Sequence, residues 1–201
     1  MRETGRRVAL VRAFRLAVAF LAGLGAAIVV APSPARLVVA TDKVIRGFNV
    51  GHTVTLTKRT QTSRCTLGAN PDHQCSPGAY YSKLSRAVIC KPSFHTTQVR
   101  EVPDAERREV QAAYGLGPQS YWPAIEIDHI VSLEVGGSND VANLFPEKAN
   151  AHPGYHVKDK LENKLHDLVC HGKMTHSRAR KQIATDWQAL YKQVFGTAPA
   201  D

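Results

Sequence analysis

The stretch that decides the fold is residues 125–147, IEIDHIVSLEVGGSNDVANLFPE. It contains two short runs of β-forming apolar residues, separated by turn-forming residues at 136–140. An adjacent polar pair, Asp128 and His129, interrupts the first run. Because neighbouring residues of a strand point to opposite faces, a regular strand would place one of the two in the core. A break or bulge near His129 would instead let both serve one site.

The residues that follow the polar pair form an ordered set of motif elements. A glycine pair comes first, then an asparagine before an apolar residue, and then two candidate histidines. Each element alone is weak evidence, but the combination is specific. The elements are Asp128-His129, Gly136-Gly137, Asn143-Leu144, and His152 or His156.

This combination resembles the motif of the HNH endonucleases, which are also called ββα-metal nucleases. The resemblance by motif covers roughly residues 120–165, and a looser likeness to small secreted bacterial HNH proteins covers the rest of the mature chain. It implies an α+β fold with a ββα-metal core, a β- and loop-rich N-terminal part that contains cysteines, and C-terminal helices. The expected divisions are a signal peptide at 1–40, the N-terminal part at 41–100, and the nuclease core with its helices at 101–197.

Hydrolysis of a phosphodiester requires an activated water molecule, charge stabilisation on the phosphate and assistance to the leaving oxygen. One divalent metal ion and one general base can supply these functions. His129 is the candidate base, because a neutral imidazole with a pKa near ~6.5 accepts a proton at neutral pH. Asp128 is the candidate metal ligand, because carboxylates bind most divalent metals. In the family the amide of the asparagine, here Asn143, bridges the loop backbone and holds the base in place; a plain loop end would predict the same hydrogen bonds.

Resemblance to colicin-type HNH nucleases makes Asp128, His152 and His156 the set that binds one divalent ion, with Mg²⁺, Mn²⁺, Ni²⁺ and Zn²⁺ left undistinguished. Two histidines four residues apart share one face of a helix. The chain departs from the pattern at Pro153-Gly154, which lie between them and argue against an unbroken helix from His152. His156 is therefore the stronger candidate. Two other carboxylates are supporting or alternative ligands, Glu126 and Glu134.

Three lysines, Lys158, Lys160 and Lys164, follow the motif on a predicted helix. They are candidates for contact with the phosphates of a nucleic acid, which would make binding depend on salt. The equally weighted alternative is a solvated helix face, on which the lysines pair with acidic residues three or four positions away. The local charge supports the nuclease interpretation as a whole, because residues 148–192 contain nine Lys or Arg and four Asp or Glu.

The N-terminus has the layout of a secretory signal peptide. Five arginines within the first fifteen residues precede an apolar run from Leu16 to Ala31, and Val38-Val39-Ala40 or Ser33-Pro34-Ala35 offers a cleavage site. We expect a secreted or cell-surface protein without stable membrane association after cleavage. The alternative is an anchor at residues 16–31, although this run is short of the ~20 residues that span a bilayer. Cleavage would reduce the net charge from +9 to +4, so the overall charge is not used as evidence for a nuclease.

All four cysteines lie in the mature part, and an even number in an exported chain indicates disulfides. Four cysteines allow three pairings, between which the sequence does not choose. No Cys-x-x-Cys occurs, which argues against zinc. We favour Cys65 with Cys75, which closes a short loop, and Cys90 with Cys170, which ties the front of the domain to the helix after the motif.

The remaining elements follow from periodicity and end signals. Residues 41–100 have β-like runs, including the apolar residues 87–90, and many loop signals. Helices are expected at 103–115, from about Tyr155 to His171 with Val157, Leu161, Leu165 and Leu168 on one face, and from Thr175 to Gly196. The apolar stripe of the last helix is expected in the core: Ala179, Ile183, Trp187, Leu190, Tyr191, Val194 and Phe195.

The sequence therefore predicts an exported, metal-dependent endonuclease with DNA favoured over RNA as its substrate. A non-catalytic module that binds nucleic acid or acts at the cell surface is the first alternative. A structural metal site, at which Asp128 and the histidines only hold the domain together, is the second. His129 argues against both alternatives, because neither requires an imidazole beside the metal ligand.

Overall fold

The computed structural model describes residues 41–117, 125–149 and 153–200. The predicted signal peptide at 1–40 and the candidate ligand His152 lie outside the described residues. Both therefore stay predictions. The chain from Val39 to Asp201 forms one unit, so residues 41–100 and 101–197 are parts of the same domain.

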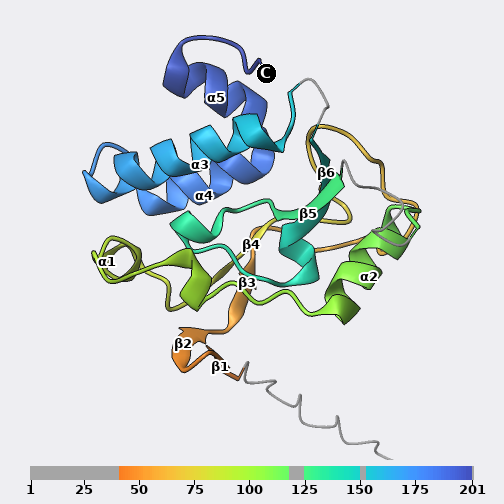
Figure 1. Ribbon diagram of the computed structural model, residues 1–201, viewed down its shortest axis with the longest axis horizontal. Coiled ribbons are helices and arrows are strands. Elements are labelled where there is room, and N and C mark those ends of the chain that lie inside the picture. Colours follow the sequence, from red (N-terminus) through yellow and green to blue (C-terminus); the bar gives the residue numbers. More distant parts are fainter. Residues whose placement is uncertain (1–40, 118–124, 150–152, 201) are drawn as a thin grey trace, which may run out of the picture. The chain divides into compact units, whose positions relative to one another are not determined.

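The strands of the described residues form three separate antiparallel pairs (Figure 1). Two pairs precede the first helix, and the third lies between α2 (Asp104–Ala113) and α3 (Tyr155–Cys170) along the chain. The α+β class expected from the sequence is thereby confirmed. The pairs are β1 (Lys43–Ile45) with β2 (Phe48–Gly51), β3 (Thr53–Thr55) with β4 (Ala79–Tyr81), and β5 (Ile125–His129) with β6 (Leu144–Lys148).

The apolar run after β5 does not continue as a strand. Leu133–Val135 forms a 3-10 turn, η3, which begins after Ser132, whose hydroxyl accepts a hydrogen bond from the amide of Glu134. Gly136 ends this turn with a φ of 80°, a conformation that favours glycine. A second 3-10 turn, η4 (Val141–Asn143), leads directly into β6. The two turns fold the segment back so that β6 pairs with β5.

The apolar residues at 87–90 form a helical turn, not a strand, which corrects the sequence interpretation. This turn, α1 (Arg86–Ile89), lies beside the C-terminal end of α3 (Tyr155–Cys170). The guanidinium of Arg86 donates to the carbonyls of Val169 and Cys170 at 2.8 and 2.7 Å. These long-range hydrogen bonds favour the helical turn over the intrinsic strand preference of the run. The 3-10 turn η1 (Thr96–Gln98) follows.

Two predicted helices are present close to their expected ends. Helix α2 (Asp104–Ala113) buries Val110 and Ala113 against β6 and η4. Helix α3 ends before Gly172, as expected. Near this end it buries Val169, whereas Leu168, which was expected on the apolar face, is only half-buried.

The expected last helix consists of two helices. Thr175 caps α4 (His176–Thr185), as predicted, by accepting a hydrogen bond from the amide of Arg178. Asp186 then adopts an extended conformation, with φ −162° and ψ 94°, and its carboxylate accepts from the amide of Ala189. Asp186 therefore ends one helix and caps the next, α5 (Trp187–Phe195).

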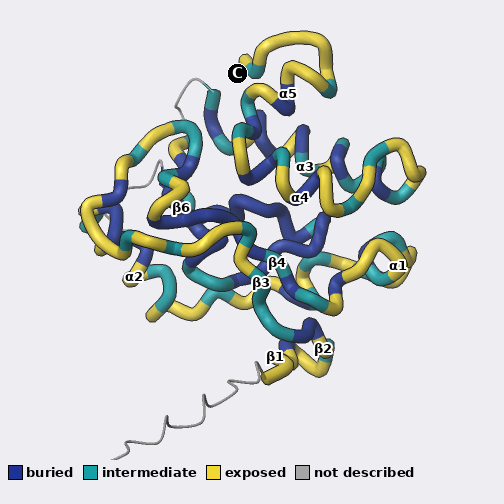
Figure 2. Tube along the Cα trace, turned by 180° about the vertical axis from the view of Figure 1, so that it is seen from behind, coloured by how far each residue is buried: buried dark blue, intermediate teal, exposed yellow. Residues whose placement is uncertain are grey.

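The buried residues run through the strand pair β5–β6, η3 and the inner faces of the C-terminal helices (Figure 2). Trp187 and Tyr191 belong to this core, as predicted, and the indole of Trp187 donates to the carbonyl of Ala69 at 2.8 Å. Phe195 was expected in the core and is instead exposed, because it lies at the end of α5.

Both favoured cysteine pairs are disulfides. Cys65 pairs with Cys75 across a Cα–Cα distance of 6.0 Å, and Cys90 pairs with Cys170 across 5.4 Å. Such bonds are typical of proteins in oxidising compartments. In the described part of the chain, the helices are too short or too polar to cross a bilayer.

Candidate functional site

Strand β5 runs regularly through the polar pair, without the bulge that one alternative required. Asp128 is opposite Phe145 and His129 is opposite Leu144 in an unshifted antiparallel register. Both polar side chains are buried, His129 at 2% exposure. The His129 Nδ1 and Asp128 Oδ1 atoms are nevertheless only 3.9 Å apart.

The imidazole of His129 is fixed by Asn139. The amide nitrogen of Asn139 donates to the carbonyl of Val99 at 2.8 Å and to the hydroxyl of Tyr81 at 3.1 Å, so its oxygen faces the imidazole. His129 Nε2 lies 3.0 Å from that oxygen and is therefore the protonated nitrogen. Nδ1 then carries the lone pair, and it has no hydrogen-bond partner among the described residues. Burial lowers the pKa of His129 to about 4, against the opposing effect of the Asp128 carboxylate.

Asn143 holds the segment that carries the histidine. Its oxygen accepts from the amides of Ala79 and Val131 at 3.0 and 2.8 Å. Its nitrogen donates to the carbonyls of Val131 and Ser138 at 3.0 and 2.8 Å. All four hydrogen-bonding positions of the amide are thus used, and the side chain is fully buried. Asn143 has the bridging arrangement expected from the resemblance, and this arrangement supports the loop without requiring catalysis.

Asp128 binds a cation supplied by the chain itself. Lys158, on α3, is 1% exposed, and its ammonium lies 2.6 Å from Asp128 Oδ2. The same ammonium lies 2.5 Å from Glu162 Oε1 and 3.7 Å from Glu147 Oε2. It also donates to the main-chain carbonyl of His129 at 2.9 Å. We call Lys158, Asp128, Glu147 and Glu162 the Lys158 cluster.

The charges of the Lys158 cluster are strongly coupled. Burial opposes ionisation of Asp128, but the charge of Lys158 prevails and the pKa of Asp128 falls to about 2. Burial raises the pKa of Glu147 to about 9 and that of Glu162 to about 7, in both cases against the effect of Lys158. Burial alone would lower the pKa of Lys158, but its carboxylate neighbours raise it well above its usual value. Asp128 and Lys158 therefore form a charged pair at neutral pH, while Glu147 holds its proton.

Two members of the predicted metal set, Asp128 and His156, are described, and each lies beside another charged residue of the chain. Asp128 Oδ2 is engaged by the ammonium of Lys158, whereas Asp128 Oδ1 lies 3.9 Å from His129 Nδ1. His156 is exposed over 70% of its side chain, its ring lies tilted against that of Tyr155, and its Nδ1 is 4.0 Å from a carboxylate oxygen of Asp159. A divalent ion at Asp128 would need the ammonium to leave first.

The three lysines that were candidates for phosphate contact have three different environments. Burial of Lys158 contradicts its predicted role at the surface, because none of its ammonium hydrogens remains for a phosphate. Lys164 is half-exposed and pairs with Asp167 at 3.1 Å, which matches the alternative of a solvated helix face. Lys160 is exposed on the same helix and stays a candidate.

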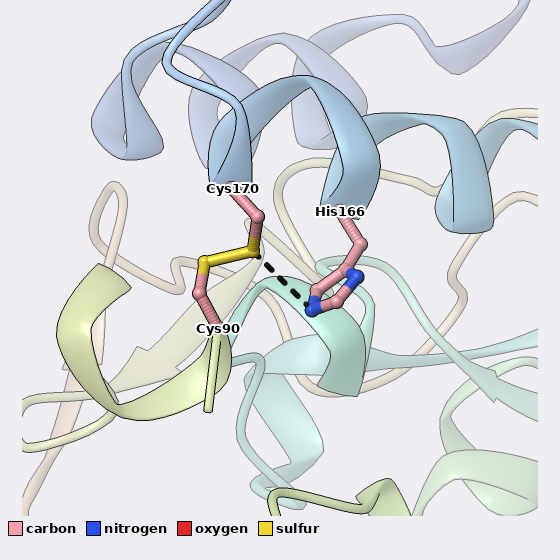
Figure 3. Close-up of side chains that lie close together, drawn as sticks. All are labelled: Cys90, His166 and Cys170. Atoms are coloured by element: carbon pink, nitrogen blue, oxygen red, sulfur yellow. Dashed lines mark hydrogen bonds between the residues drawn. A yellow bond between two sulfur atoms is a disulfide. The ribbon is translucent and has the colours of Figure 1, made fainter. Parts of the chain in front are cut away.

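A second group of potential ligands surrounds one of the disulfides. His166 Nε2 lies 3.5 Å from Cys170 Sγ and 3.1 Å from the carbonyl of Ile89, and Cys90 completes the group (Figure 3). The three side chains could hold a metal ion only as thiolates and imidazole. In the structure the two sulfurs are bonded to each other, so this group does not supply the predicted ion.

The two supporting carboxylates, Glu126 and Glu134, are placed differently. Glu126 lies on β5 opposite Glu147, and burial, with help from Asp128, raises its pKa. Glu134 has a buried oxygen without a hydrogen-bond partner in the described part and lines a cleft of about 360 Å³. The other residues that line this cleft are Phe94, His95, Thr96, Thr97, Asn163 and His166.

Sequence reasoning missed Asn139, Glu147 and the exposed Arg100, whose charge acts on His129 and opposes the raised pKa of Glu126. It included Glu162 only as an acidic neighbour of the lysines on a solvated helix face, whereas Glu162 pairs with the buried Lys158. Asn139 lies in a segment that was read only as a turn. A signal existed for Glu162, because it lies four residues after Lys158 on the helix. For Arg100 no local pattern exists.

Comparisons of the chain with protein-family models, with curated proteins and with solved structures found no match. The class of protein is therefore argued from the fold and the residues of the site.

Proposed function

We propose that the chain is an exported endonuclease of the HNH class that hydrolyses phosphodiester bonds, with DNA as its favoured substrate. The observation that carries the proposal is His129, whose Nε2 is fixed by Asn139 and whose Nδ1 is left with a lone pair. The order β5, β6, α3, with Asp128-His129 on the first strand and Asn143 before the second, supports the proposed ββα core.

The proposed reaction uses His129 Nδ1 as general base toward a water molecule. The neutral imidazole takes a proton from the water, whose oxygen attacks the phosphorus; the bond from phosphorus to the leaving oxygen breaks, and solvent protonates that oxygen. The hydrogen bond from Nε2 to Asn139 holds the tautomer and the ring orientation, and the charge that develops on the ring is stabilised by Asp128, 3.9 Å away. Arg100 and Lys160, both exposed, are the proposed phosphate contacts. No step is assigned to a metal ion, since the described residues do not form the expected set.

A non-catalytic nucleic-acid-binding module is the second candidate, and a specific observation favours it. His129 is almost completely buried and Asp128 is engaged by Lys158, so the site is closed. In that case the chain binds nucleic acid without cleaving it, and His129 and Asn139 are parts of a polar core.

Incubation of the exported protein with supercoiled plasmid decides between the two. Reactions contain EDTA, or one of Mg²⁺, Mn²⁺, Ni²⁺ and Zn²⁺, and products are resolved on agarose gels. The nuclease proposal expects conversion to nicked and linear forms in at least one condition. A mobility shift without cleavage in every condition would support the binding module and contradict the nuclease.

A further inference from the structure

The ammonium of Lys158 lies among four oxygen atoms in the interior of the protein. Asp128, Glu162 and the main-chain carbonyl of His129 accept its three hydrogens at 2.6, 2.5 and 2.9 Å. Glu147 Oε2 is the fourth oxygen, at 3.7 Å. The oxygens come from β5, β6 and α3, so the two strands and the helix are joined through one cation.

Glu147 is the carboxyl group of the Lys158 cluster that receives no hydrogen bond from the ammonium. It is 2% exposed, and neither of its carboxyl oxygens has a hydrogen-bond partner among the described residues. An ammonium has only three hydrogens, and all three are already donated elsewhere. Three carboxyl groups thus surround a single positive charge. Burial keeps the proton on Glu147, whose buried oxygens lack a hydrogen-bond partner among the described residues, and a cation of higher charge would engage all three carboxyl groups.

We propose that Lys158 is the resident cation of this site, and that its ammonium occupies the position at which Asp128, Glu147, Glu162 and the His129 carbonyl would otherwise bind one hard divalent ion. The ammonium and the ion exclude each other. The unmodified protein therefore holds no divalent ion at Asp128, and removal of the ammonium creates a site for one. This inference does not depend on nuclease activity, because it concerns the binding of cations in the absence of nucleic acid.

The chemistry of the donors supports this exchange. Oxygen is the donor that Mg²⁺, Mn²⁺ and Ca²⁺ prefer, and carboxylates with a main-chain carbonyl are common ligands of such ions. Lys158 is tethered to the site by α3, so it competes at high effective concentration. Divalent ions need contacts of about 2.0–2.6 Å, so the carboxyl group of Glu147 must move inward when an ion replaces the ammonium.

Binding of Mn²⁺ to the full chain purified from an exporting host tests the proposal. Titration calorimetry and the EPR signal of free Mn²⁺ measure affinity, and thermal unfolding is followed in EDTA and in Mn²⁺. Lys158→Met removes the charge and keeps most of the side-chain volume. We expect one Mn²⁺ to bind Lys158→Met at least about tenfold more tightly than it binds the unmodified protein, since a like charge this close commonly costs at least that factor. Mn²⁺ should also raise the Tm of this variant.

Matched variants complete the test. Lys173→Met changes an exposed lysine just after the same helix and should bind Mn²⁺ as the unmodified protein does. Lys158→Met combined with Glu147→Gln should lose the gain in affinity. The proposal is overturned if the unmodified protein binds one Mn²⁺ as tightly as Lys158→Met does, and Asp128→Asn abolishes that binding. Where Lys158→Met does not fold, binding of one Mn²⁺ by the unmodified protein that Asp128→Asn abolishes overturns the proposal by itself.

Discussion

Asn139 and Asn143 are two buried amides, four positions apart, with separate tasks. Asn139 orients the imidazole of His129, whereas Asn143 connects the segment after β5 to β4. Because an unpaired buried polar group is expensive, the stability of the loop depends on Asn143 more than on any single apolar contact there. Asn139 bears instead on the chemistry, because it decides which nitrogen of His129 carries the proton.

Replacement of Asn143 by alanine should therefore be severely destabilising. It leaves two backbone amides and two carbonyls without their partner, and we expect a loss on the order of 3–5 kcal/mol. Urea unfolding followed by circular dichroism measures the loss. Asn163→Ala is the control, because Asn163 is exposed and bonds only within its own helix, so its change should stay within about 0.5 kcal/mol. Equal effects of the two substitutions would show that Asn143 does not hold the loop.

At this scale the sequence predicts residues that a motif identifies and misses those that the tertiary fold brings together. The adjacent Asp128 and His129 and the bridging amide of Asn143 were predicted from the motif. Lys158 was expected at the surface, because a lysine is seldom buried without a partner and its partners Asp128 and Glu147 are distant in sequence. Lys158 lies three and seven residues before the buried Leu161 and Leu165, and this spacing places it on the inner face of α3. That spacing was visible in the sequence.

The elements of the C-terminal part show how one residue divides a helix. The apolar stripe continues from Ile183 to Trp187, four residues apart, so periodicity alone predicts one helix across the break. Asp186 interrupts it through its backbone conformation, which the sequence does not specify, since aspartate also occurs inside helices. Likewise, the apolar run at α1 is helical because of its contacts with α3. One of these contacts is a disulfide between two cysteines that are 80 residues apart.

Substitution of Asp186 by alanine should weaken α5 without unfolding the domain. The carboxylate accepts from the amide of Ala189, and loss of such a cap costs about 1 kcal/mol. Asp186→Asn keeps an acceptor and should recover most of this loss. Thermal unfolding of both variants measures the difference. A variant with alanine that is as stable as the one with asparagine would mean that the cap does not set the start of α5.

At the scale of the whole molecule, the two disulfides close loops of very different size. Cys65 and Cys75 are 10 residues apart, whereas Cys90 and Cys170 are 80 residues apart and connect α1 to the end of α3. In the chain-entropy account a disulfide stabilises by restricting the unfolded chain, and the restriction grows with the loop. The long-range disulfide should therefore contribute more to the free energy of unfolding.

We expect Cys90→Ala/Cys170→Ala to be about 2 kcal/mol less stable than Cys65→Ala/Cys75→Ala, from the difference in loop length alone. Chemical denaturation of the two double variants, each with its other disulfide intact, gives the comparison. A larger loss from the short loop would indicate that native packing around Cys65 and Cys75 outweighs chain entropy.

Cleavage by His129→Ala is the most direct test of His129 as the general base. Plasmid nicking is compared with that of the unmodified protein and of His73→Ala, which removes an exposed histidine bonded to the carbonyl of Thr185. If His129 Nδ1 is the general base, His129→Ala should lose on the order of 10²-fold or more in rate while DNA binding is retained, and His73→Ala should keep its rate. Nicking by His129→Ala at the unmodified rate would contradict the account.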